Sequence, residues 1–317
     1  MKLSLLPQYP VLFRKHLRRK LANHKVPCPL CGCRESALIC ITPNVHMAIF
    51  RHIFVEKVVA CRSCGFAWTN PRPDPEVLAK YYTEDYLLEG LSVPKSVEEF
   101  LGEDYKEIWF SKDRDLRLIL EQKQGGRLLD IGCASGTLLW LAREQGFSVC
   151  GVDVGQRSAE FVRGLLGMEV FCGQLESAHF PERSFDAVSM IHALEHVPDP
   201  RPVVREIHRI LRDDCVFVGV VPNFAGWSSQ KFGPSWDWLQ PHNHYSHFTP
   251  DSLRSLMKRE GFDVEIRSEE GRYGDAEILK DFGPIEIQNI FSQLKGSELV
   301  FVARKTDAGS TVNLAGS

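Results

Sequence analysis

Four cysteines near the N-terminus occur in two pairs with the spacing of a zinc site. Cys28 and Cys31 form the first pair, Cys61 and Cys64 form the second, and a glycine follows each pair. A tetrahedral zinc ion takes four thiolate or imidazole ligands, and each C-x2-C turn supplies two of them. The sequence therefore predicts a closed structural zinc site. A redox-active pair is the alternative, and the second matched pair argues against it.

Histidines gather in two later segments where a general base could act. The first contains His192, Glu195 and His196, and the second contains His244 and its neighbours in the stretch 241–249. Histidine suits this role because its pKa of about 6.5 lies close to neutral pH. We take His244 as the first candidate for the base and His196 as the second. The alternative is that these side chains only shape a pocket or bond a loop backbone.

A small-residue turn follows an apolar stretch in the middle of the chain. Leu128 and Leu129 lead into Asp130, and Gly132 and Gly136 come directly after it. Glycine lets a backbone approach a ligand closely, and the amides at a helix N-terminus favour a negatively charged group. Asp153 follows about 20 residues later, where a carboxylate can bind ribose hydroxyls. The G-x-G-x-x-G dinucleotide motif is absent, and a helix-capping role for Asp153 is the alternative.

The elements around this turn alternate between short apolar runs and helical patterns. This alternation predicts an α/β fold with a mostly parallel sheet, whose ligands bind at the carboxyl ends of the strands. The stretch from Glu98 to Gln124 reads as one helix that ends at Gly125 and Gly126. The apolar runs that we predict as strands include 127–133, 147–154, 185–191, 215–223, 263–269 and 298–305.

Three segments resemble the successive motifs of class I S-adenosylmethionine-dependent methyltransferases. They are LLDIGCASGTLLWLA, CGVDV and SFDAVSMIHALEHVPDPRPVVREIHRILR. The resemblance implies a Rossmann-like sheet flanked by helices, with S-adenosylmethionine as cofactor. It implies that Asp130, Gly132 and Gly136 surround the methionine part, that Asp153 binds the ribose, and that Gln174 and Leu175 lie beside the adenine. We include Cys133, Val154 and His192 in the expected cofactor site.

Two further segments resemble parts of zinc-containing sugar methyltransferases. The stretch CGFAWTNPRPDPEVLAKYYTEDY is similar to their N-terminal zinc-binding domain, which implies a zinc-ribbon-like module forming one wall of the acceptor site. The stretch 241–249 is similar to the Tyr-Glu-His-x-Ser-Tyr-Phe segment of deoxysugar C-methyltransferases. His244 keeps the histidine, whereas His242 and Asn243 replace the tyrosine and the glutamate. These replacements favour methylation of oxygen over carbon.

The segment from His192 to His196 resembles two kinds of metal site. The H-x-x-E-H spacing occurs in a class of zinc peptidases, but here it ends a strand inside a methyltransferase motif, so we reject that interpretation. An E-x-x-E-H arrangement binds magnesium in some ubiquinone-pathway and small-RNA methyltransferases, and in this chain His192 replaces the first glutamate.

Composition and charge narrow the functional classes. The 317 residues carry a net charge of −3, which gives no general attraction for nucleic acid. We find no secretory signal and no apolar run long enough to span a bilayer, so we expect a cytoplasmic protein with reduced thiols. We divide the chain into a basic amphipathic segment (1–26), the zinc-binding module (27–75), a helical linker or lid (76–124), the methyltransferase domain (125–305) and a disordered tail (306–317).

The expected activity is transfer of a methyl group to a hydroxyl of a small molecule or glycan, such as a sugar or natural product. The alternatives are a zinc-containing RNA methyltransferase and a S-adenosylmethionine-binding scaffold without catalysis. Trp227, Trp236 and Trp238 either stack on the acceptor or belong to a half-buried lid. The basic N-terminal segment is either a helix packed on its own protein or a peripheral membrane contact.

Overall fold

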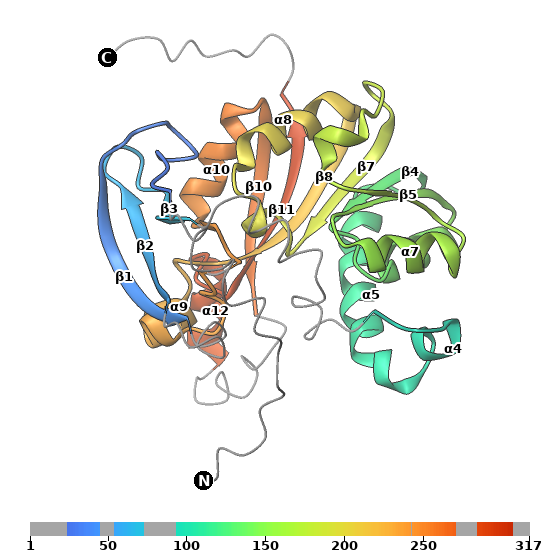
Figure 1. The fold of residues 1–317 in the computed structure, drawn as a ribbon, viewed down its shortest axis with the longest axis horizontal. Helices are drawn as coiled ribbons and strands as arrows, with labels where there is room; N and C mark the ends of the chain where they lie inside the picture. The colour runs from blue at the N-terminus through green and yellow to red at the C-terminus, as the bar shows by residue number, and fades with distance from the viewer. Residues whose placement is uncertain (1–23, 45–53, 73–92, 242, 271–283, 307–317) are drawn as a thin grey trace, which may run out of the picture.

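The computed structural model describes residues 24–44, 54–72, 93–241, 243–270 and 284–306. Apolar strands that are buried on both faces form the larger of its two sheets. The sheet has seven strands in the order β10-β11-β8-β7-β4-β5-β6 (Figure 1). Strands β4 to β8 run parallel, and β11 is antiparallel to both β8 and β10. The predicted α/β class is confirmed. The strands are β4 (Gly126–Ile131), β5 (Phe147–Asp153), β6 (Glu169–Cys172), β7 (Phe185–Ile191), β8 (Leu211–Pro222), β10 (Phe262–Glu269) and β11 (Glu298–Lys305).

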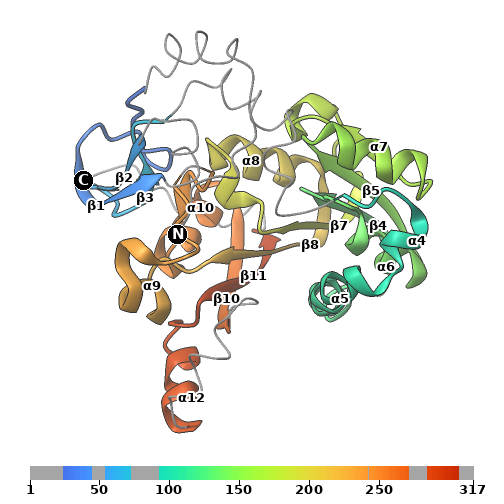
Figure 2. The ribbon, with the colours of Figure 1, turned by 60° about the horizontal axis from the view of Figure 1, so that its bottom comes forward.

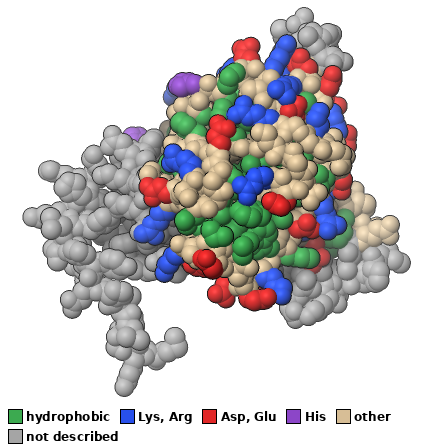
Figure 3. Space-filling view, turned by 90° about the vertical axis from the view of Figure 1, so that its right-hand side faces the viewer, with side chains coloured by type: hydrophobic (Ala, Val, Ile, Leu, Met, Phe, Trp, Pro, Cys, Tyr) green, Lys and Arg blue, Asp and Glu red, His purple; other side chains and the backbone are tan. Residues whose placement is uncertain are grey.

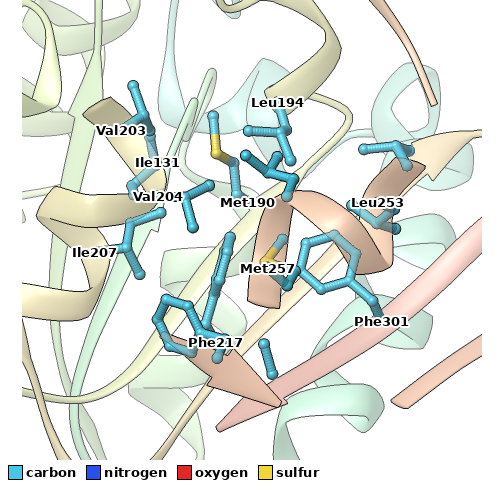
Figure 4. Packing of buried hydrophobic residues seen from close by; sticks show 14 of the residues in the cluster. Ile131, Met190, Leu194, Val203, Val204, Ile207, Phe217, Leu253, Met257 and Phe301 are labelled. Carbon is cyan, nitrogen blue, oxygen red and sulfur yellow. The ribbon is translucent and has the colours of Figure 1, made fainter. Parts of the chain in front are cut away.

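Helices cover both faces of this sheet. Helix α8 (Pro200–Ile210) begins where the Asp199 side chain accepts from the Arg201 amide, and α10 (Pro250–Arg259) begins with a capping box between Thr249 and Ser252. Both pack on one face, and Figure 4 shows their apolar side chains among those of the strands. Helices α5 (Lys106–Leu120) and α6 (Thr137–Glu144) pack on the other face. The remaining helices are α4 (Val97–Phe100), α7 (Gln156–Gly164), α9 (Trp227–Phe232) and α12 (Pro284–Ser292).

The single helix predicted from Glu98 to Gln124 is wrong at its start. The chain instead forms α4, a 3-10 turn η1 (Glu103–Tyr105) and then α5. Gly102 lies at the break with extended backbone angles, and helical geometry does not continue through it. The helix also stops at Leu120, ahead of Gly125 and Gly126, which both have positive φ.

The smaller sheet joins the cysteine-bearing segment to the histidine segment. Its strands are β1 (Ser36–Asn44), β2 (Phe54–Cys61), β3 (Ala67–Thr69) and β9 (Ser246–His247), paired in that order and all antiparallel. In Figures 1 and 2 the strands β1 to β3 lie near α9 and α10, on the side of the molecule away from α7. The apolar runs named above as predicted strands all belong to the larger sheet, and the structure adds the pairing of these four strands.

The opposite side of the molecule exposes apolar side chains. Figure 3 shows hydrophobic side chains grouped there among charged ones. The exposed large apolar residues of the elements on that side, α4 to α7 and their connections, include Leu101, Phe110, Val154 and Leu165.

Two predicted segments lie largely outside the described residues. Of the basic amphipathic segment only residues 24–26 are described, and of the tail only Thr306 is described. Part of the predicted linker, 76–92, is likewise outside. Within the described part of the chain, the helices are too short or too polar to cross a bilayer.

Candidate functional site

The four predicted zinc ligands lie together in the structure. The sulfurs of Cys28 and Cys64 are 3.6 Å apart, those of Cys31 and Cys61 are 3.5 Å apart, and all four lie within 4.8 Å of one another. A tetrahedral ion with zinc–sulfur bonds of about 2.3 Å requires sulfurs about 3.8 Å apart, so the cluster fits. Each pair ends in a glycine with positive φ, Gly32 at 77° and Gly65 at 73°.

Burial and backbone hydrogen bonds shift the pKa values of three of these thiols. Burial raises the pKa of Cys61, but the backbone amides of Cys64 and Ser63 outweigh that effect and lower the pKa to about 7. Burial raises the pKa of Cys28 well above its ordinary value and that of Cys64 to about 11. A bound zinc ion would displace the protons of these thiols.

The turn after β4 has the backbone shape that the glycine pattern predicted. Gly132 and Gly136 have φ values of 77° and 76°, and Ala134 has 46°. A Cβ atom on Gly132 would lie 2.8 Å from the Cβ of Ala193, and one on Gly136 would lie 2.8 Å from Cγ2 of Val162. Larger residues are therefore excluded. The contact with Ala193 also places this turn directly beside the segment that follows β7.

Asp130 and Asp153 stand at the ends of the neighbouring parallel strands β4 and β5. Asp130 is 4% exposed and accepts a hydrogen bond from the Ser189 hydroxyl at 2.8 Å. Burial raises the pKa of Asp130 to about 6, and the charge of Asp153 contributes in the same direction. That repulsion requires the two carboxylates to lie near each other.

The Asp153 carboxylate bridges the turns that follow the two strands. It accepts from the Ala134 amide at 2.8 Å and from the Gly155 amide at 2.7 Å, one bond to each oxygen. Each carboxylate oxygen has two acceptor positions, so both oxygens keep capacity for further donors. Burial raises the pKa of Asp153, and the two backbone amides oppose this rise.

Helix α5 adds a pair of charged residues that the sequence argument missed. Asp115 is fully buried, and its Oδ2 lies 3.4 Å from the ammonium of Lys112. The Lys112 charge lowers the pKa of Asp130 and the Asp115 charge raises it, so both lie near the β4 strand end. The sequence signal that could have indicated this pair is Asp115, an aspartate on the buried, otherwise apolar face of the helix.

The other predicted cofactor residues surround these two strand ends. Cys133 and Leu175 are buried, at 5% and 3% exposure, whereas Val154 is 43% exposed. Gln174 is exposed and precedes the 3-10 turn η2 (Leu175–Ala178) after β6. All of them follow the carboxyl ends of β4, β5 and β6.

Two histidines and a glutamate meet beside the turn that follows β7. Glu195 and His196 belong to the 3-10 turn η3 (Leu194–His196), and His244 comes from the loop before β9. Their ligand atoms lie within 4.8 Å of one another, and the two imidazole rings are 4.6 Å apart at 80°. The structure thus brings together the two histidine segments that the sequence singled out.

Backbone carbonyls determine the tautomers of the two histidines. His196 Nδ1 lies 3.1 Å from the Asn243 carbonyl oxygen, and His244 Nδ1 lies 2.8 Å from that of Trp238. A carbonyl only accepts, so each neutral ring carries its proton on Nδ1 and a lone pair on Nε2. Burial lowers the pKa of His196 and favours its neutral form.

Glu195 adds acceptor atoms to the same place. Its side chain is 1% exposed, and among the described residues neither carboxylate oxygen has a hydrogen-bond partner. Its nearest basic group is His192, whose Nδ1 is 3.6 Å from Oε1. A buried carboxylate beside two imidazole lone pairs is costly unless a proton or a cation lies between them. The arrangement can accept a proton from a ligand or hold a divalent cation.

His192 lies at the edge of this cluster. Its Nε2 is 3.3 Å from Oε1 of Glu298, and its ring stacks on Trp238 at 5.2 Å and 23°. Trp227 and Trp236 are 8% and 5% exposed, so their rings are part of the core. Of the three tryptophans proposed to face an acceptor, only Trp238 is half-buried beside the histidines.

Comparison with known proteins agrees with this fold. A family model described as a methyltransferase domain matches residues 103–265, just over half of the chain. Ubiquinone biosynthesis O-methyltransferase of Pseudomonas aeruginosa is 35% identical over 94 residues, which cover 28% of this chain and 40% of that protein. The protein of the same name from Neisseria meningitidis serogroup A is 34% identical over 158 residues, which cover 44% of this chain and 65% of that protein. The chain thus spans less than two thirds of these relatives.

A solved structure extends the likeness of the fold. The Burkholderia thailandensis 1,6-didemethyltoxoflavin-N1-methyltransferase, with bound 1,6-didemethyltoxoflavin and S-adenosylhomocysteine, matches with a TM-score of 0.50 and 18% identity. The match covers 80% of this chain and 96% of that one. Together with the strand order and the glycine turn, the family match shows that this chain belongs to the methyltransferase-domain family of class I S-adenosylmethionine-dependent enzymes.

Proposed function

We propose that this chain transfers a methyl group from S-adenosylmethionine to a hydroxyl of a small molecule, with a sugar or natural product as the acceptor class. The observation that carries this proposal is the contact between Gly132 and Ala193. It places the cofactor turn beside the cluster of Glu195, His196 and His244. A methyl donor and a proton acceptor are then neighbours, as methyl transfer to a hydroxyl requires.

The strand ends account for recognition of the cofactor. The remaining acceptor positions of Asp153 bind the ribose hydroxyls, and the buried Asp130 carboxylate attracts the ammonium of the methionine part. Lys112 is close enough to Asp130 to receive the methionine carboxylate. Gln174 and Leu175 then border the adenine, after β6.

The histidine cluster accounts for the transfer step. His244 accepts the hydroxyl proton on Nε2, while its Nδ1 proton stays bonded to the Trp238 carbonyl. The acceptor oxygen forms a bond to the methyl carbon as the sulfur–methyl bond breaks, and the sulfonium becomes a neutral thioether. His196 lies across from His244 and is the second candidate for the proton. The names of the O-methyltransferase relatives support oxygen as the methylated atom.

A divalent cation is the second way in which the same residues would serve this reaction. The buried Glu195 carboxylate and the two histidine lone pairs form a compact set of ligands. A bound cation would lower the pKa of an acceptor hydroxyl. Glu195, His196 and His244 would then hold the ion, and none of them would act as the base.

For the zinc-binding module we propose a structural role. The four cysteines fill a tetrahedral site completely and leave no open position for substrate. The strand β3 that follows the second cysteine pair contacts the histidine segment through β9. Zinc would thereby hold one wall of the acceptor site in place.

The test is transfer of labelled methyl from S-adenosylmethionine to a panel of sugars, nucleotide sugars and phenols. We expect turnover with at least one hydroxyl acceptor and loss of turnover in His244→Ala. His179→Ala is the matched control, because His179 is an exposed histidine in the connection between β6 and β7. Binding of S-adenosylmethionine without transfer to any class would favour the inactive scaffold. Turnover that needs added Mg²⁺ or Zn²⁺ after brief chelation would favour the cation over the base.

A further inference from the structure

A hollow of about 660 Å³ opens on the zinc-binding module, apart from the methyl-transfer site. It is lined by strands β1 and β2, by residues on either side of the first cysteine pair and by Arg62 within the second pair, and Val59 of β2 is part of its lining. Val58, which precedes Val59 in β2, packs against Trp236 and Leu239 from the loop before His244. Because successive strand residues point to opposite faces, the hollow and the histidine cluster lie on opposite faces of the smaller sheet.

The hollow is strongly basic. Lys25, Arg34, Lys57 and Arg62 line it, and Glu35 is the only acidic residue among the described residues of its lining. All four cations are exposed, and none of them forms an ion pair with a residue that the structure describes. The whole chain carries a charge of −3, so this concentration of positive charge is local. Like charges held together repel one another; four thiolates around a zinc ion, with a net charge of −2, would offset part of that repulsion, and an anion in the hollow would relieve more of it.

The backbone that carries these cations is fixed. The Arg62 amide donates to the Glu35 carbonyl at 3.1 Å and joins the two cysteine turns. Asn70 accepts from the Val26 amide at 3.0 Å and donates to the Val26 carbonyl at 3.3 Å, beside Lys25. The four cations thus come from separate segments that converge on one place. Val59 and the half-exposed Leu38 add apolar surface within the same hollow.

We propose that this hollow binds an organic diphosphate, with the diphosphate held by the four cations and its organic group resting on the apolar surface. Arginine and lysine are the side chains that recognise phosphate oxygens: arginine donates bidentate hydrogen bonds, and lysine acts as a point charge. This site goes beyond the proposed methyl transfer, because its position excludes direct contact with His244.

The experiment is calorimetric titration of the zinc-loaded full chain with inorganic pyrophosphate and, separately, with uridine diphosphate. We expect saturable binding of one ligand per chain, weakened by added salt, with uridine diphosphate binding at least as tightly as pyrophosphate. The pyrophosphate measurement tests the charges, and the comparison tests the apolar surface. Absence of saturable binding, or tighter binding of pyrophosphate than of uridine diphosphate, would overturn the proposal.

Two double variants distinguish specific binding in the hollow from nonspecific electrostatic attraction of an anion to the protein surface. Arg34→Gln with Lys57→Gln removes two of the four cations, and we expect binding about tenfold weaker or worse. Lys258→Gln with Arg259→Gln removes the same two charges from the exposed end of α10 and should change binding less than about twofold. Equal weakening by both variants would reject the site. Zinc content and S-adenosylmethionine affinity, measured in both, report folding independently of methyl transfer.

Discussion

The hydroxyl of Thr69 donates a hydrogen bond to the backbone carbonyl of His244 over 2.9 Å, although the two residues are 175 positions apart. Thr69 ends β3, directly after the second cysteine pair, and its hydroxyl also lies 3.1 Å from Nε2 of His247. Burial lowers the pKa of His247 to about 3, so this ring is neutral and donates from Nε2 to Thr69. The zinc-binding module therefore touches the backbone of the proposed base.

Thr69→Val removes this bond and keeps the shape of the side chain. We expect turnover to fall about tenfold while affinity for S-adenosylmethionine stays unchanged, because the cofactor turn lies elsewhere. The buried His244 carbonyl and His247 ring lose their partner, so the free energy of unfolding should fall by ~1–2 kcal/mol. Steady-state kinetics and urea unfolding measure the two effects. Thr69→Ser should restore turnover, and failure to do so would make the threonine methyl group, rather than its hydroxyl, the important feature.

Metal analysis of the purified chain should find about one zinc ion per chain. Cys64→Ser should lose the ion and destabilise the small sheet, since Cys64 is one of the four ligands. Cys33→Ser is the matched control, because Cys33 lies in the same segment outside the cluster. Zinc retained in Cys64→Ser, or absent from reduced wild-type protein, would contradict the four-cysteine site.

The larger sheet was predictable because its strands are apolar on both faces and separated by helices of regular period. The addition of β9 to the smaller sheet was not predictable, since β9 has two residues and its partner β3 has three, too few to show a pattern. This pair joins segments far apart in the chain, which no local signal indicates.

The site shows the same division. Residue types identified the cysteines, the glycine turn, Asp153 and both histidine segments. Packing alone determines that Lys112 and Asp115 lie near Asp130, and that carbonyls of Trp238 and Asn243 fix the histidine tautomers. Those contacts depend on the fold of helix α5 and of the loop before β9.

Asp153→Ala should weaken binding of S-adenosylmethionine strongly, by about 100-fold if two ribose hydrogen bonds to a charged acceptor are lost. Calorimetry measures the affinity, and circular dichroism checks that the fold is retained. The amides of Ala134 and Gly155 lose their acceptor in this variant. Asp153→Asn is therefore the better control for local structure, because an amide oxygen can still accept one of these bonds. Unchanged affinity in Asp153→Ala would remove this residue from the cofactor site.

Asp130→Asn should stabilise the cofactor-free protein at high pH. The carboxylate has a pKa of about 6 in the folded chain, above its ordinary value of 3.8, because burial disfavours the charge. Its contribution to stability is complete below pH 4 and is lost as the pH rises through 6. The variant should therefore exceed the wild type by on the order of 1–3 kcal/mol at pH 8, with a difference that shrinks towards pH 5. Urea unfolding at both pH values measures this, and a difference independent of pH would contradict it.

His244→Gln should abolish turnover and leave the affinity for S-adenosylmethionine within about twofold, because a glutamine cannot take up a proton at neutral pH. Loss of a general base typically costs about 100-fold or more in rate. The matched variant His196→Gln should cost less if His244 is the base, and a larger loss there would reverse the assignment. Both variants also test whether a cation binds here, since each removes one of the three candidate ligands. If the wild type binds a second metal ion per chain that either variant loses, the histidines act as ligands and the proton must go elsewhere.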